Sequence, residues 1–250
     1  MELSKHYRVE ALVRLSEGRM FYLVTDERED QPTRKCWECG HEDSPRGDAR
    51  CAGCGHAFEP RTQFLMSVRW DSANFPTYEK FFEKRFKHPG LLHPDDVFLH
   101  GAVLCSLVRY RGESLMLDEA SPYAPREVLH MGQRFAGLLA FLHHNGVRLR
   151  SLTSANVLIR RDESRLLLFD PNVEEVLDTA IADGDRGHEL AALGEMLRRF
   201  TPVNCNRLRD FFQMTEQGTY ANPLEFGRAI EKVFDAVDGE KPLAGVAAMS

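Results

Sequence analysis

The sequence has no apolar stretch long enough to form a secretory signal or a membrane span. Its first segment, MELSKHYRVEALVRL, carries charges throughout and lacks the apolar centre of a signal peptide. Nowhere does the chain approach the roughly 20 consecutive apolar residues that a bilayer-spanning helix needs. We therefore expect a cytoplasmic protein without a membrane span.

An excess of positive charge is also missing. The chain has 32 Lys and Arg residues against 38 Asp and Glu residues, which gives a net charge of −6. A nucleic-acid-binding domain usually shows the opposite balance, because its side chains must neutralise phosphates. Short basic runs such as RLR and IRR are better explained as solvated edges. We expect no nucleic acid among the partners.

Cysteine is scarce, but four of the six cysteines fall in one segment, CWECGHEDSPRGDARCAGCGHAF. Cys36 and Cys39 form one CxxC pair, Cys51 and Cys54 form a second, and a glycine follows each pair. Cytoplasmic cysteines are usually thiols or metal ligands rather than disulfides. Two such knuckles supply four thiolates with the tetrahedral geometry that suits Zn²⁺. We predict an inserted zinc ribbon over residues 34–59 with these four ligands.

The alternative explanation is a pair of redox motifs or incidental thiols. The glycines and the polar, coreless character of the segment favour a structural metal instead. His41 and His56 lie close by, but four cysteines already complete the coordination shell and leave no open position for catalysis. Cys105 and Cys205 stand in apolar surroundings, so we expect both to be buried packing residues.

The rest of the chain alternates between strand-like and helix-like segments. Runs rich in β-branched and aromatic residues lie on both sides of the cysteine segment, and a long segment with apolar residues at helical spacing follows. Two short strands come next, and the final third is helical. These segments are YRVEALVRL, MFYLVTD, QFLMSVRW and AVLCSLVRY, then PREVLHMGQRFAGLLAFLHH, then NVLIR and RLLLFD, then GHELAALGEMLRRF, CNRLRDFFQMTE and NPLEFGRAIEKVF.

In order and spacing these segments resemble a bacterial protein kinase domain of the eukaryotic Ser/Thr type. YRVEALVRLSEGRMFYLV resembles the first two strands with their phosphate loop, and GLLAFLHHNGVRLRSLTSANVLI resembles the long helix with its catalytic loop. LLLFDPN stands where a kinase has its DFG motif, and HELAALGEML resembles the helix after the activation segment. The likeness runs from about Tyr7 to Phe234.

The resemblance implies an α+β fold, a two-lobed kinase-like domain over residues 1–236. The N-terminal lobe is expected over about residues 1–110, with the zinc ribbon inserted in it, and the C-terminal lobe over about residues 111–236. Residues 237–250 have no periodic apolar face, so we expect a tail or a linker there.

The resemblance also assigns the nucleotide-binding positions of a kinase, and several of them are altered here. Phosphoryl transfer in that family uses a glycine-rich loop and a strand lysine held by a helix glutamate. The segment LSEGRMFY retains only Gly18 of the loop, and Arg69 stands in place of the lysine. Its partner would be Glu79, or Glu83 in a second register. Arginine does not replace a lysine ammonium, because its charge is spread over a planar fork.

In the catalytic loop, Ser151 replaces the aspartate that accepts the substrate proton, and Thr153 replaces a lysine. Serine cannot act as a general base at neutral pH, and loss of such a base typically costs about 10²–10⁴ in rate. Asn156 and Asp170 are retained as candidate Mg²⁺ ligands. Both side chains could instead hold the loop together through hydrogen bonds.

The segment between Asp170 and the helix that contains Glu189 is also too short for a full activation segment. We therefore predict a pseudokinase, with weak or absent ATP and Mg²⁺ binding. It would be a signalling or scaffolding module that acts through a protein partner or a fused effector domain. The alternatives are a divergent active phosphotransferase and an ATP-sensing switch, both with Asn156 and Asp170 holding Mg²⁺.

Overall fold

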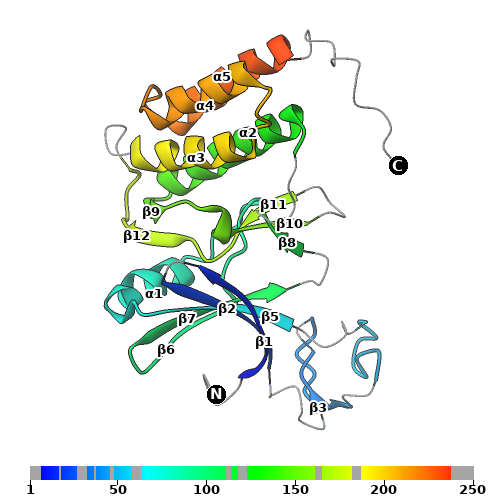
Figure 1. Ribbon diagram of the computed structural model, residues 1–250. Coiled ribbons are helices and arrows are strands. Elements are labelled where there is room, and N and C mark those ends of the chain that lie inside the picture. The colour runs from blue at the N-terminus through cyan, green and yellow to red at the C-terminus, as the bar shows by residue number, and fades with distance from the viewer. Residues whose placement is uncertain are drawn as a thin grey trace. The chain divides into compact units, whose positions relative to one another are not determined.

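The computed structural model describes residues 7–16, 18–26, 33–36, 38–45, 48–57, 63–110, 114–117, 123–160, 165–181 and 187–237 (Figure 1). The chain divides into two compact units. Unit 1 comprises Met1–Arg85 and His93–Ser114, and unit 2 comprises Phe86–Leu92 and Leu115–Ser250. Among the described residues, none of the helices combines the length and the apolar character that crossing a membrane requires.

Unit 1 is built on a five-stranded antiparallel sheet with the order β1-β2-β5-β7-β6. Its β-branched and aromatic runs form strands because alternate side chains can be buried on the two faces. The bounds, in sheet order, are Tyr7–Ser16, Arg19–Asp26, Gln63–Arg69, Val103–Tyr110 and Asp96–His100. The strands predicted on either side of the cysteine segment are therefore present.

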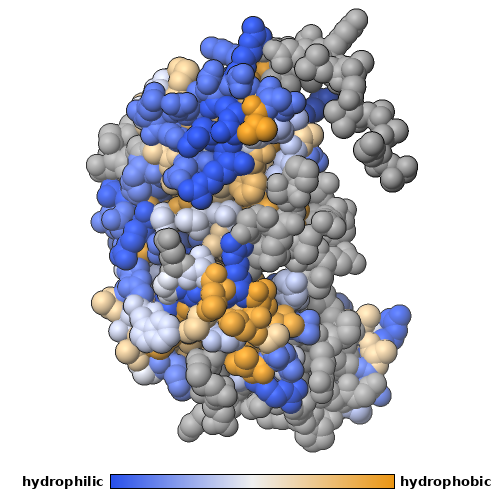
Figure 2. All heavy atoms as spheres, in the orientation of Figure 1, coloured by the Kyte–Doolittle hydropathy of each residue, from blue (hydrophilic) through white to orange (hydrophobic). Residues whose placement is uncertain are grey.

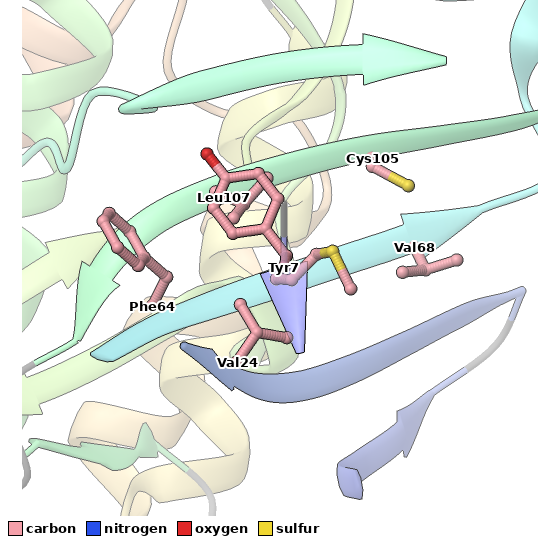
Figure 3. Packing of buried hydrophobic residues seen from close by; sticks show 7 residues of the cluster. Tyr7, Val24, Phe64, Val68, Cys105 and Leu107 are labelled. Carbon is pink, nitrogen blue, oxygen red and sulfur yellow. The ribbon is translucent and has the colours of Figure 1, made fainter. Parts of the chain in front are cut away.

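One face of this sheet carries a hydrophobic cluster. Its buried members come from strands β1, β2, β5 and β7 (Figure 3), and they are Tyr7, Val24, Phe64, Met66, Val68, Cys105 and Leu107. Cys105 is fully buried, as predicted, and burial raises the pKa of its thiol to about 12. The cysteine acts here as a small apolar residue.

Strand β1 also exposes large apolar side chains. Leu12 is 50% exposed, Val13 41% and Leu15 66%. Figure 2 shows hydrophobic atoms gathered over the part of the molecule where β1 lies in Figure 1. Two register shifts in the pairing of β1 with β2 interrupt the regular alternation of side chains between the two faces of the sheet.

Two smaller pieces complete unit 1. Helix α1 (Phe75–Glu83) follows the 3₁₀ turn η2 (Ser72–Asn74) and begins with a proline in its first turn. The cysteine segment lies between β2 and β5, as predicted, and carries its own two-stranded sheet of β3 (Thr33–Arg34) and β4 (Ser44–Pro45). This hairpin is separate from the five-stranded sheet.

Unit 2 is mainly helical. The predicted long helix is α2, and it packs on α5, while α3 packs on α4 (Figure 1). A side chain at Gly132 of α2 would lie 2.9 Å from Ile230 and 3.1 Å from Leu197, so glycine allows these helices to approach closely. The bounds are α2 Pro125–His144, α3 Gly187–Phe200, α4 Asn206–Glu216 and α5 Pro223–Val237.

Four short strands, β9 to β12, lie between α2 and α3, and a fifth, β8, precedes α2. β9 and β12 pair with each other, and β10 lies between β11 and β8 in a three-stranded sheet. The bounds are β8 Ser114–Met116, β9 Val147–Ser151, β10 Val157–Arg160, β11 Arg165–Leu168 and β12 Asn172–Val176. The 3₁₀ turn η4 (Ser154–Asn156) lies between β9 and β10 and forms part of the candidate catalytic loop.

One expectation about unit 2 needs correction. Cys205 is half-buried rather than buried, because it lies in the turn before α4, where its thiol contacts the side chain of Asn204 at 3.7 Å. The last helix ends at Val237. The remainder of the predicted tail, residues 238–250, lies outside the described residues.

Candidate functional site

The four cysteine sulfur atoms of the insert converge on one point. All four lie within 4.8 Å of one another, with 3.8 Å between Cys36 and Cys54 and 3.7 Å between Cys39 and Cys51. A Zn–S bond of about 2.3 Å gives a tetrahedron with an edge of about 3.8 Å. These separations match that edge and are far longer than the roughly 2.05 Å of a disulfide bond. The cluster could therefore hold a Zn²⁺ ion.

Two equivalent turns position these sulfur atoms. The amide of Gly40 donates to the carbonyl of Cys36 at 2.8 Å, and the amide of Gly55 donates to that of Cys51 at 2.9 Å. Both glycines adopt φ values that other residues rarely adopt, +77° and +73°. Each CxxCG sequence thus closes a tight turn with both thiols on its inner side.

The neighbouring histidines contribute backbone groups to these turns. The carbonyl of His41 accepts from the amide of Cys36 at 2.7 Å, and that of His56 accepts from Cys51 at 2.8 Å. Within the described part of the chain, the group of potential metal ligands contains the four cysteines and neither imidazole. A four-sulfur shell is typical of a structural metal.

Arg69 lies at the end of β5 and is only 4% exposed. Its Nη1 donates to the hydroxyl of Tyr78 at 2.5 Å, and its Cζ lies 4.1 Å from the centre of the Tyr78 ring. The guanidinium is therefore held by an aromatic side chain of α1, through a hydrogen bond and a cation–π contact.

The predicted pairing of Arg69 with Glu79 or Glu83 stays a prediction, and the burial of α1 bears on it. Tyr78 and Phe81 form the buried face of α1, whereas Glu79 and Glu83 are exposed. A residue one position along a helix is rotated by about 100°, so Glu79 cannot share the face of Tyr78. The phase of α1 therefore places Tyr78 on the buried face, where it contacts Arg69.

Gly18 lies in the connection between β1 and β2. Because Ser16 pairs with Arg19, the connection consists of residues 17 and 18 alone. Gly18 has φ +70°, which a two-residue hairpin of this kind commonly requires. The turn geometry alone accounts for this glycine, whose nucleotide-binding role stays a prediction.

Ser151 is the last residue of β9, and it pairs with Asn172 of β12. The side-chain amide of Asn172 donates to the Ser151 hydroxyl at 2.8 Å. The residue predicted to replace the catalytic aspartate therefore takes part in a cross-strand contact. A hydroxyl in this place can orient a neighbour, but it cannot take up a proton at neutral pH.

Asn156 is 1% exposed, and both ends of its side chain have partners. Its Nδ2 donates to the backbone carbonyl of Asp170 at 2.7 Å, and its Oδ1 accepts from the Thr153 hydroxyl at 2.8 Å. Its own carbonyl accepts from the amide of Phe169 at 2.8 Å. Asn156 thus connects the turn after β9 to the segment after β11.

Asp170, the second candidate Mg²⁺ ligand, is 1% exposed and adopts φ +44°. Few residues other than glycine occupy this left-handed region, although aspartate tolerates it better than most. The structure therefore brings Asn156 and Asp170 together through a hydrogen bond to the backbone of Asp170, and their role as Mg²⁺ ligands stays a prediction.

A buried carboxylate anchors the catalytic-loop strand, and it was not recognised from the sequence. Glu189 of α3 is fully buried. One carboxylate oxygen accepts from the amide of Leu149 at 2.5 Å, and the other pairs with the imidazole of His143. His188 donates to the carbonyl of Leu149 at 2.7 Å.

The sequence did contain an indication that Glu189 is buried and paired. Glu189, Leu193, Met196 and Leu197 all lie on the buried face of α3, so the glutamate occupies the apolar side of an amphipathic helix. An acidic residue is almost never fully buried without a partner. Its position therefore indicated a paired carboxylate, although the identity of the partners depended on the tertiary structure.

Solved protein kinase domains are similar to this chain. The PknI kinase domain of Mycobacterium tuberculosis has a TM-score of 0.56 at 15% identity, covering 91% of this chain and 96% of that one. A double mutant of that domain gives a TM-score of 0.58. The fold is that of a protein kinase domain. Rad53 1–466 in complex with AMP-PNP is also similar, with a TM-score of 0.50 at 11% identity, covering 94% of this chain and 60% of that one.

No family model matches the sequence, and no curated protein matches it either. The relationship therefore rests on the kinase-like fold, with an antiparallel sheet in unit 1 and a mainly helical unit 2. At such low identity a shared fold does not carry function, which must be argued from the residues of the site.

Proposed function

We propose that this chain is a kinase-like signalling or scaffolding module without phosphotransfer activity, which acts through contacts with other proteins and contains one structural Zn²⁺. The observation that carries the proposal is the state of the catalytic loop. Ser151 replaces the proton-accepting aspartate and contacts Asn172, while the two ends of the Asn156 side chain bond Thr153 and the carbonyl of Asp170. The loop is stabilised as structure and lacks a general base.

The nucleotide-binding positions of unit 1 support the same proposal. The Arg69 guanidinium is buried against Tyr78, and both glutamates of α1 are exposed. The β1–β2 connection contains a single glycine, so side chains occupy positions where a backbone must approach phosphates closely. A protein that lacks these contacts has to act through its surface, and exposed apolar side chains such as those of β1 often mark such surfaces.

A second candidate function, an ATP-sensing switch, is favoured by Asp170. Its left-handed backbone costs about 1–3 kcal/mol, and strain of this kind is concentrated at functional sites. A Mg²⁺ ion with ATP could be the ligand for which the conformation is retained. Such a switch would bind the nucleotide without transferring phosphate.

A thermal-shift titration tests these functions against each other. Wild-type protein and Asp170→Asn are melted with ATP and Mg²⁺, and with ATP and EDTA. Asparagine tolerates the left-handed conformation, so this variant removes the charge with little added strain. We expect no concentration-dependent rise in melting temperature, because a ligand that binds the folded state must stabilise it. A Mg²⁺-dependent rise in the wild type that is lost in Asp170→Asn would establish the switch instead.

A further inference from the structure

Ser44 has no part in the predicted zinc shell, yet its hydroxyl lies against one of the four sulfurs. It is on β4, is fully buried, and its Oγ donates to Cys51 Sγ at 3.5 Å. The same oxygen accepts from the amide of Ala52 at 3.2 Å. Because the amide can only donate, the hydroxyl proton remains available to the sulfur.

The contact distinguishes Cys51 from the other ligands. Cys51 Sγ also accepts from the amide of Gly53 at 3.3 Å, so two donors converge on this sulfur. Across the described residues, no other hydroxyl donates to any of the four sulfurs. The second knuckle is further fixed by Arg50, whose Nη1 donates to the carbonyl of Gly55 at 3.1 Å.

The charge of a four-thiolate zinc site explains why a hydroxyl donor beside the Cys51 sulfur is useful. A thiol must lose its proton to solvent before it binds a metal, and four thiolates around one Zn²⁺ leave a net charge of −2. A hydroxyl that keeps its own proton and donates it in a hydrogen bond stabilises the thiolate formed. Groups that orient metal ligands in this way are worth about 10–100-fold in metal affinity.

We infer that Ser44 is a positioning residue for the metal: it orients the Cys51 thiolate and connects the β3–β4 hairpin to the second knuckle. The inference rests on the proposed zinc site. It predicts that metal binding and formation of the hairpin are coupled through one hydroxyl, since Ser44 also pairs with Arg34 in the hairpin. Metal removal should then loosen the hairpin as well as the knuckles.

The test compares the full-length wild type with Ser44→Ala, Ser44→Thr and Glu42→Ala. Threonine retains the hydroxyl, and Glu42→Ala is a matched control, because Glu42 forms only an exposed ion pair with Lys35 in the same insert. Zn²⁺ affinity is measured by competition with a chromophoric chelator. Co²⁺ replacement adds a readout of the sulfur shell through its thiolate charge-transfer band.

We expect Ser44→Ala to weaken Zn²⁺ binding by about tenfold or more and to alter the Co²⁺ band. Ser44→Thr should stay within about threefold of the wild type, and Glu42→Ala should match it. Equal affinity in Ser44→Ala and the wild type would overturn the role of the hydroxyl, as would equal losses in the alanine and threonine variants. A wild type that binds neither Zn²⁺ nor Co²⁺ would refute the metal site itself, which is a separate result.

Discussion

The side-chain amide of Asn156 donates a hydrogen bond to the backbone carbonyl of Asp170 across 2.7 Å. Both residues are 1% exposed, and they come from two segments of unit 2, the turn before β10 and the residues after β11. A pair that resembles two metal ligands in the sequence is thus linked by a direct structural contact. This link gives both residues a structural role that does not depend on phosphotransfer.

Asn156→Ala should destabilise the protein. The substitution removes the buried donor to the Asp170 carbonyl, which typically costs about 1–3 kcal/mol, whereas water can replace the bond of the exposed Thr153 hydroxyl. Urea unfolding would show the loss as a lower midpoint. Asn204→Ala, at an exposed position, serves as the control and should change little. An unchanged midpoint in Asn156→Ala would mean that the residue is retained for a ligand.

Glu189→Ala should be more severe. It removes the acceptor of the Leu149 amide and the partner of the buried His143 imidazole in one step. Breaking a buried pair of this kind typically costs about 3–5 kcal/mol. Urea unfolding again provides the measurement, with Glu195→Ala on the exposed side of the same helix as the control. A loss of less than about 1 kcal/mol would show that the buried carboxylate is not an anchor.

Alanine substitutions at two glycines with nearly equal φ values allow the cost of backbone strain to be measured separately from the cost of steric overlap. Gly146 and Gly218 have φ +75° and +76°, but a side chain at Gly146 would overlap the carbonyls of Leu177 and Thr179, the latter at 2.6 Å, whereas nothing lies near Gly218. Gly218→Ala should cost about 1–2 kcal/mol, the price of the left-handed conformation. Gly146→Ala should cost about 1–3 kcal/mol more, because the overlap adds to it. Equal chemical-denaturation midpoints would contradict the close approach.

Cys39→Ser should abolish metal binding and leave the five-stranded sheet intact. The insert has its own two-stranded sheet, and the sulfur cluster includes no residue of β1, β2, β5, β6 or β7. Elemental analysis of protein purified without chelator should give one Zn²⁺ per wild-type chain and none in the variant. Hydrogen exchange should show protection retained in β5 and lost in the insert.

Cys205→Ser is the matched control for that experiment, since Cys205 lies outside the sulfur cluster. It should retain the metal in full. Loss of protection throughout unit 1 in Cys39→Ser would show that the insert is required for the fold of the larger sheet.

Ser151→Asp should fold but should not acquire phosphotransfer activity. The Asn172 amide that donates to the Ser151 hydroxyl can donate equally to a carboxylate, so the change fits the site. The glycine loop and the lysine would still be missing, and catalytic groups that act as a unit are not recovered one at a time. Autophosphorylation and phosphorylation of a generic substrate are assayed in parallel with the wild type. Activity in the variant alone would mean that the rest of the site is intact.

Several features of this protein followed from its sequence because their physical causes are local. The CxxCG spacing brings thiols together through two short turns, and the apolar periodicity of residues 125–144 defines a helix whatever it packs against. The order of strands and helices was sufficient to predict the kinase-like fold. The assignment of Ser151 to the position of the catalytic aspartate rests on the resemblance alone and stays a prediction.

Only the tertiary structure decided which side chains meet. Arg69 contacts Tyr78 because the phase of α1 puts this tyrosine on the buried face of the helix. Glu189 accepts a hydrogen bond from the amide of Leu149, 40 residues away in the chain, because α3 packs against β9. Such contacts depend on how whole helices and strands pack on one another, and local propensity or residue spacing does not encode this packing.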